Sequence, residues 1–146
     1  MSEIIIRKAE PRDFEAVQEI QRAGRLFACL DPNCDSVIPI NEMEEHSGSP
    51  NGLFGVAEVH DLVVGFIFGE KLVAAWVLAS YFAVRPDYRG SEVFIKLGAW
   101  FVEEAKKRGA KHIFMYTDAN NKKLINFYKR FDFRAGGDYV EMIKEI

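Results

Sequence analysis

The chain has few of the residues that build disulfide frameworks or metal centres. It contains 2 cysteines and 3 histidines in 146 residues. Cys29 and Cys34 are close enough in sequence to pair or to share a metal, but no second Cys or His pair accompanies them at ligand spacing. We therefore expect two free thiols and no metal site, and we expect His46, His60 and His112 to lie in loops or at strand edges.

Long apolar runs are also missing. The run from Leu72 to Phe82 is too short to span a membrane and has the composition of a strand. The first residues lack the basic region and apolar core of a signal peptide, so we expect a cytoplasmic protein. The G-x-S-x-G motif of Ser/His/Asp hydrolases is absent. A net charge of -3 gives no reason to expect nucleic-acid or membrane partners.

The composition that remains is that of a globular protein. Hydrophobic residues make up 49% of the chain and charged residues 28%, and no repeat, linker or low-complexity segment interrupts it. We expect one domain over residues 1–146. The 12 phenylalanines leave open a homodimer with aromatic residues at its interface.

The most informative stretch runs from Ser80 to Arg108. It begins as a strand that Pro86 ends, continues as a turn through Asp87–Gly90, and becomes a helix from Ser91, which is a candidate N-cap. The helix face is predicted from apolar residues three and four apart, namely Phe94, Leu97, Phe101 and Ala105. The first N–H groups of such a helix have no partner within it, so they suit a phosphate.

The other elements follow from the same patterns. A short strand at Ile4–Ile6 precedes a helix that starts at Pro11 and buries Phe14, Val17 and Ile20, and a short helix is expected around Met43. Further strands are expected at Leu53–Val59, Leu62–Phe68, Val73–Val84, His112–Thr117 and, at the end, Phe133 with Tyr139–Ile143; a further helix is expected at Asn121–Arg130.

Short connections at His60–Asp61 and Gly69–Lys71 predict an antiparallel meander. The long helix after Ser91 allows a right-handed crossover that makes His112–Thr117 parallel to Ser80–Val84. The fold class is therefore α/β (α+β), a three-layer domain whose mixed, largely antiparallel sheet is flanked by helices. A ligand can enter where the two parallel strands separate.

Four strings carry a family resemblance: I-I-I-R-K-A-E-P-R-D-F near the start, V-R-P-D-Y-R-G at 84–90, N-x-x-L-x-x-F-Y at 121–128, and F-D-F after it. In this order they resemble the GCN5-related N-acetyltransferase (GNAT) superfamily over nearly the whole chain. The resemblance implies a GNAT-like domain that moves an acetyl group from acetyl-coenzyme A to a primary amine of a small molecule or a protein, through a direct ternary complex.

The resemblance also implies roles for single residues. Backbone N–H groups of Phe82, Ala83 and Val84 would bind the pantetheine arm and the thioester oxygen. The pyrophosphate would lie against Arg89, Gly90, Ser91, Glu92, Val93 and Phe94. Asn121 would contact the cofactor arm or cap its helix, or do both. Tyr128 would be the general acid that protonates the departing thiolate, since a phenol with a pKa near 10 can act in this way.

The phosphate turn departs from the family pattern. Asp87 replaces the leading Gln or Arg, and Glu92 and Phe94 replace small residues. A side chain can obstruct the approach of backbone to phosphate, and a carboxylate repels it, unless Glu92 points to solvent. A GNAT-fold binding or regulatory module without turnover is therefore the alternative function.

Two features bear on the acceptor and the proton transfer. The segment from Arg25 to Pro50 contains Asp31, Asp35, Glu42, Glu44 and Glu45 against one base. Such an acidic lining would select a cationic acceptor such as a polyamine, although a solvated loop has the same composition. Val73–Val84 contains no Asp, Glu or His that could be a general base. Tyr81, Ser80, Glu70 or an ordered water remain as candidates.

Overall fold

The computed structural model describes residues 3–24, 37–88, 92–142, 144 and 146. Two compact units make up the chain, Met1–Met115 and Tyr116–Ile146. The first unit contains β1 (Ile4–Lys8), α1 (Phe14–Gly24), α2 (Ile40–Gly48), β2 (Gly52–Val59), β3 (Leu62–Lys71), β4 (Trp76–Val84), α3 (Glu92–Lys107) and β5 (His112–Phe114). Short 3-10 turns lie at Pro11–Asp13, Val73–Ala75 and Pro86–Tyr88. The second unit contains α4 (Lys122–Lys129).

The sheet of the first unit has the strand order β1-β2-β3-β4-β5. The first four strands form an antiparallel meander, and β5 is parallel to β4. The turn between β2 and β3 is made by His60 and Asp61, whose φ angles of 50° and 61° match the positive-φ turns that join twisted antiparallel strands. The predicted meander and parallel crossover are confirmed.

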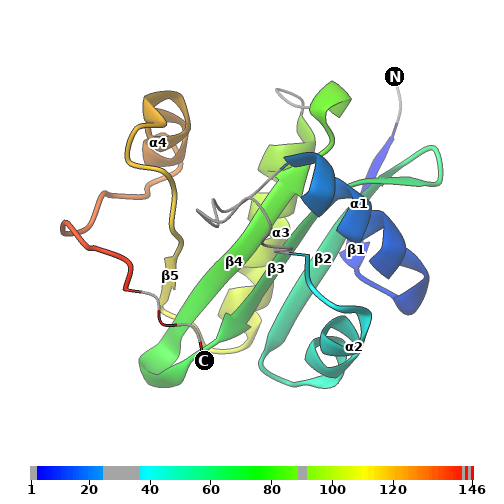
Figure 1. Ribbon diagram of the computed structural model, residues 1–146, viewed down its shortest axis with the longest axis horizontal. Helices are drawn as coiled ribbons and strands as arrows, with labels where there is room; N and C mark the ends of the chain where they lie inside the picture. The colour runs from blue at the N-terminus through cyan, green and yellow to red at the C-terminus, as the bar shows by residue number, and fades with distance from the viewer. Residues whose placement is uncertain (1–2, 25–36, 89–91, 143, 145) are drawn as a thin grey trace. The chain divides into compact units, whose positions relative to one another are not determined.

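Helices cover both faces of this sheet and create three layers (Figure 1). On one face α1 and α2 bury Phe14, Val17, Ile20 and Met43 against the sheet. On the other face α3 buries Leu97, Phe101 and Ala105. The predicted α/β class and the buried face of the first helix are thus confirmed. In the first turn of α3 the residue that is fully buried is Val93 rather than Phe94, which is half-buried.

The connection between β3 and β4 differs from the prediction. Gly69 was expected in a turn with Glu70 and Lys71, but all three belong to β3, and β4 starts at Trp76 instead of Val73. A side chain at Gly69 would collide with the backbone oxygen of Leu78 and the ring of Phe101, so close packing explains this glycine. The turn is made by Val73–Ala75.

Of the two strands predicted at the end of the chain, one is shorter than predicted and the other is not formed. Of His112–Thr117 only His112–Phe114 is a strand. Residues 131–142, which include Phe133 and most of Tyr139–Ile143, contain no strand, and Tyr139 is 84% exposed. A β-rich composition marks a segment that can pair, but a strand needs a partner to satisfy its backbone. Ile143 lies outside the described residues.

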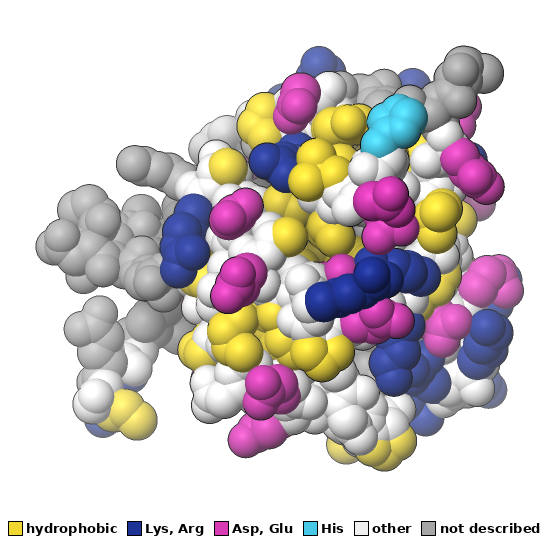
Figure 2. All heavy atoms as spheres, turned by 90° about the vertical axis from the view of Figure 1, so that its right-hand side faces the viewer, with side chains coloured by type: hydrophobic (Ala, Val, Ile, Leu, Met, Phe, Trp, Pro, Cys, Tyr) yellow, Lys and Arg dark blue, Asp and Glu magenta, His cyan; other side chains and the backbone are white. Residues whose placement is uncertain are grey.

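The β1 edge of the sheet is tied to the start of α1 by an ion-pair network. Arg7 donates to both carboxylate oxygens of Asp13 at 2.7 and 2.9 Å and to Glu58 at 3.0 Å. Asp13 also accepts the backbone N–H of Glu10 at 2.8 Å. The face viewed in Figure 2 carries acidic and basic side chains side by side, which discourages further strands from adding to this edge.

No helix within the described residues is both long and apolar enough to cross a bilayer.

Candidate active site

The carboxyl half of β4 borders an opening in the sheet. β5 pairs only with Trp76–Leu78, at the start of β4, and among the described residues of the first unit no strand pairs with 79–84 on that side. Ser80 is an extra residue in the β3–β4 pairing, because Phe68 lies opposite Tyr81 while Gly69 lies opposite Ala79. Such a bulge increases the local bend of a strand and is common beside functional sites.

The expected partners of the cofactor arm and phosphate are close together in the first unit. Phe82, Ala83 and Val84 end β4, and Glu92, Val93 and Phe94 begin α3. The rings of Phe82 and Phe94 are stacked, with centroids 3.9 Å apart and planes 4° from parallel. Arg89, Gly90 and Ser91 lie outside the described residues.

Two of the three departures in the phosphate turn do not obstruct the start of α3. The Glu92 side chain is 74% exposed and pairs with Lys96 at 3.7 Å. It therefore points to solvent and favours the helix dipole from the first turn. The Phe94 ring packs back against β4 through Phe82. Asp87 is exposed in the short turn at Pro86–Tyr88.

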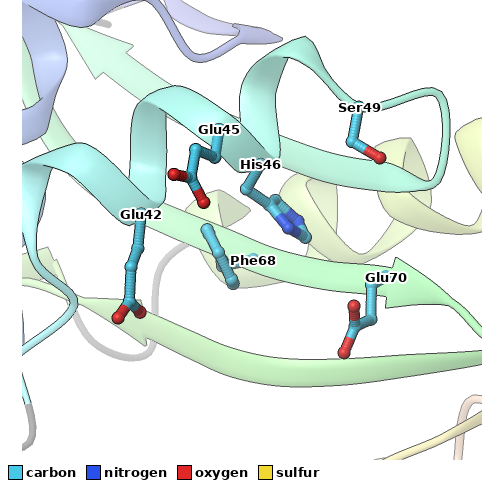
Figure 3. Close-up of a pocket in the computed structure, with 6 residues that line it drawn as sticks. All are labelled: Glu42, Glu45, His46, Ser49, Phe68 and Glu70. Carbon is cyan, nitrogen blue, oxygen red and sulfur yellow. The ribbon is translucent and has the colours of Figure 1, made fainter.

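A second feature lies on the opposite face of the sheet, between α2 and β3. It is an open groove of about 460 Å³ lined by Glu42, Glu45, His46, Ser49, Phe68 and Glu70, and we call it the acidic groove. Glu42, Glu45 and His46 lie on one stripe of α2, spaced i, i+3 and i+4, and Ser49 is the C-cap that follows the helix. Figure 3 shows the ring of Phe68 between the side chains of Glu42 and His46.

His46 is held in place on two sides. Its ring stacks on Phe68 with centroids 3.9 Å apart, and its Nε2 donates to the carbonyl oxygen of Gly69 at 2.5 Å. Burial lowers the pKa of His46 below its usual value, while the Gly69 carbonyl, the charge of Glu70 and the backbone of Leu53 oppose that change. The imidazole is therefore neutral at pH 7.

Tyr81 links the acidic groove to the carboxyl half of β4. Its ring lies 6.1 Å from that of Phe68, edge to face, and it packs with the layer that contains α1 and α2. Burial raises the pKa of Tyr81, and the negative charge of Glu42 raises it further. A phenol with a raised pKa is protonated at pH 7 and is a weak candidate for the general base.

The second unit contains the two remaining candidate residues. Asn121 precedes α4 and accepts the backbone N–H of Leu124 through Oδ1 at 3.1 Å, so it is the N-cap, as its capping alternative predicted. Tyr128 lies in the last turns of α4, with its ring 5.6 Å from that of Phe133. Burial raises the pKa of Tyr128 to about 12.

The sequence pattern missed part of the acidic groove. Glu70 was considered only as a base, and His46 was expected outside any site. Glu44, which was grouped with the acidic lining, does not line the groove. The spacing of the polar stripe on α2 was the available signal, but nothing in the sequence indicated that the stripe faces Phe68. Asp31, Asp35, Cys29 and Cys34 lie outside the described residues.

Comparison with known proteins identifies the family and the fold. Residues 14–133 match the acetyltransferase (GNAT) family. An uncharacterised N-acetyltransferase of Methanocaldococcus jannaschii is 32% identical over 104 residues, which are 64% of this chain and 45% of that protein. The chain thus spans less than half the length of this curated relative.

Two solved structures illustrate the shared fold. A transcriptional regulator from Bacillus halodurans is 20% identical with a TM-score of 0.80, over 97% of this chain and all of that one. An aminoglycoside N-acetyltransferase, AAC(6')-Iy in complex with CoA, is 14% identical with a TM-score of 0.78, over 100% of this chain and 97% of that one.

Proposed function

Because the chain belongs to the acetyltransferase (GNAT) family, we propose that it transfers an acetyl group from acetyl-coenzyme A to a primary amine in a direct ternary complex. The observation that carries this proposal is the opening beside β4, where the backbone of Phe82–Val84 continues beyond the last residue paired with β5. Polar backbone groups at such an opening can bind an amide-containing arm.

The start of α3 fits the phosphate end of the cofactor. Its first N–H groups have no partner within the helix and carry the positive end of its dipole. Glu92 points away and pairs with Lys96, and Phe94 is stacked on Phe82, so neither side chain fills the space in front of the helix. We assign the pyrophosphate to the backbone of Glu92, Val93 and Phe94, together with Arg89, Gly90 and Ser91 before them.

Tyr128 is assigned as the proton donor to the sulfur, and Asn121 as a contact of the cofactor arm in addition to its cap. A phenol with a pKa of about 12 remains protonated throughout the physiological range. It can therefore donate to a thiolate as the C–S bond breaks.

The acidic groove is assigned as the entrance for a cationic acceptor such as a polyamine or a lysine-like amine. Three carboxylates around an aromatic ring raise the local concentration of cations, and the ring face adds cation–π attraction. This effect fades with ionic strength.

Calorimetry and thermal unfolding with acetyl-coenzyme A test the cofactor assignment. Binding to the native state alone stabilises it by about 2.7 kcal/mol at a hundredfold excess over the dissociation constant. That gain corresponds to roughly 5–10 °C for a chain of this size. Glu92→Gln is the matched control, and its affinity should stay within about twofold of the parent because the carboxylate is exposed and paired. No heat and no shift at millimolar cofactor would refute cofactor binding.

A panel of amines tests the acceptor assignment. We expect polyamines to be acetylated better than neutral or acidic amines, and the preference to weaken with salt. Glu45→Gln should raise KM for spermidine by up to about fivefold, since one exposed charge contributes about 0.2–1 kcal/mol. Glu44→Gln removes the same charge from the neighbouring residue, outside the groove, and should leave KM unchanged. Equal effects of the two variants would refute the groove as the acceptor site. Cofactor binding without transfer to any amine would favour the regulatory module.

A further inference from the structure

The proposed reaction needs a proton acceptor for the attacking nitrogen, and β4 itself contains no carboxylate or histidine. The acidic groove does contain a base that is neutral at pH 7. Resting on the proposed function, we propose that His46 is the general base of the acetyl transfer, taking a proton from the acceptor amine at Nδ1.

The tautomer of His46 follows from its contact with the backbone. A carbonyl oxygen only accepts hydrogen bonds, so the nitrogen that lies 2.5 Å from the Gly69 oxygen, Nε2, carries the hydrogen. In a neutral imidazole the other nitrogen, Nδ1, then carries the lone pair. A fixed backbone acceptor on one nitrogen is a common way to orient a catalytic histidine and to support its protonated form.

The position of His46 connects the groove to the reacting end of β4. Its ring stacks on Phe68 of β3. Phe68 lies opposite Tyr81, and Tyr81 directly follows the bulge residue Ser80 in β4. The next residues, Phe82–Val84, are those assigned to the thioester. An amine that reaches β4 from the acidic groove therefore passes the imidazole.

The charges around His46 suit a base that becomes positive. Glu42 and Glu45 line the groove from α2, Glu70 lines it from β3, and Tyr81 on β4 is a neutral phenol at pH 7. Among the described residues that line the groove, all three charged neighbours are carboxylates, which stabilise an imidazolium as the proton arrives. The same carboxylates hold a cationic acceptor before it loses its first proton.

The proton balance of the reaction gives His46 one defined step. The ammonium form of the acceptor loses its first proton to solvent, and the neutral nitrogen forms its bond to the thioester carbon. That nitrogen is then cationic, and His46 takes its second proton. The C–S bond breaks, the sulfur takes a proton from Tyr128, and the phenolate regains one from the imidazolium through solvent. The overall products are the amide, the thiol and one proton.

The test is the pH dependence of acetyl transfer to spermidine. His46→Gln retains an N–H donor for the Gly69 carbonyl but does not titrate. We expect kcat to fall by about a hundredfold or more. We also expect the part of the parent's acid-side loss of kcat/KM that has an apparent pKa below about 6.5 to disappear in the variant, while the loss caused by protonation of the acceptor amine remains in both proteins. His112→Gln, at a histidine stacked on Trp76 instead, should behave as the parent does.

Chemical rescue separates a base from a packing residue. His46→Ala should lose activity and regain part of it with added imidazole, and the rescue should increase with the concentration of neutral imidazole. If the His46 ring were needed only to pack on Phe68, no such dependence on neutral imidazole would be seen. A folded His46→Gln protein with turnover within threefold of the parent and the parent's pH profile would overturn the assignment of His46. A parent that acetylates no amine would overturn the proposed function, and with it this step.

Discussion

Replacing Tyr128 with phenylalanine separates catalysis from packing, because the change deletes one hydroxyl and keeps the ring. The ring contact with Phe133, at 5.6 Å between centroids, is available to phenylalanine as well. We therefore expect the variant to bind acetyl-coenzyme A as the parent does and to unfold at nearly the same temperature.

The expected loss of turnover follows from the pKa of the phenol. Donation by a positioned acid is typically worth about a hundredfold to ten-thousandfold in rate. Tyr128 has a pKa of about 12. Full transfer of its proton to a thiolate with an ordinary pKa of about 8.5 is uphill by roughly 3.5 units, or about 5 kcal/mol at 1.36 kcal/mol per unit. In the transition state the phenol thus acts mainly as a hydrogen-bond donor to the developing thiolate, and its proton reaches the sulfur only as the phenol is reprotonated through solvent. We therefore expect a fall near the lower limit, about a hundredfold in kcat.

The assay is the release of free thiol at saturating acetyl-coenzyme A, with the best amine from the panel. Tyr139→Phe is the matched control, since Tyr139 belongs to the same unit and is 84% exposed. A well-folded Tyr128→Phe protein with parental kcat would refute the assignment and would leave water as the source of the proton.

Two further predictions concern stability. Asp13→Ala removes the carboxylate that pairs with Arg7 at 2.7 Å. We expect the free energy of unfolding, measured in urea, to fall by about 3 kcal/mol. This value is at the low end for a broken buried ion pair because Arg7 keeps Glu58 as a second partner. The pKa of Asp13 is lowered from 3.8 in the folded protein, so its contribution is present above pH 3.8 and is lost as pH falls through the folded value; the variant should lack that part of the acid dependence. Gly69→Ala should cost about 1–3 kcal/mol or more, because the added methyl meets the backbone of Leu78, whereas Gly48→Ala, with nothing within 4 Å, should cost nothing measurable. A Gly69 variant as stable as the Gly48 variant would contradict this packing.

Local patterns in the sequence were enough for most elements of the first unit and for their layers. Apolar spacing located the buried face of α1 and, except at Phe94, that of α3. Pro86 ended β4, and the short His60–Asp61 connection specified a hairpin. These features depend on residues within a few positions of one another, so periodicity and turn chemistry report them directly. The motifs around Val84–Gly90 and Asn121–Tyr128 were likewise enough to identify the family.

The tertiary structure decided what depends on contacts between distant residues. A glycine at position 69 suggested a turn, but Gly69 belongs to β3. It is a glycine because the nearby backbone of Leu78 leaves no room for a side chain. Phe94 would obstruct a phosphate, but Phe82 offers its ring a stacking partner. His46 gained a defined tautomer and a place beside three carboxylates only because its side chain meets Phe68 and Gly69 of β3, and Gly69 is 23 residues further along the chain. Spacing within a helix specifies which side chains share a face, and only packing specifies what that face meets.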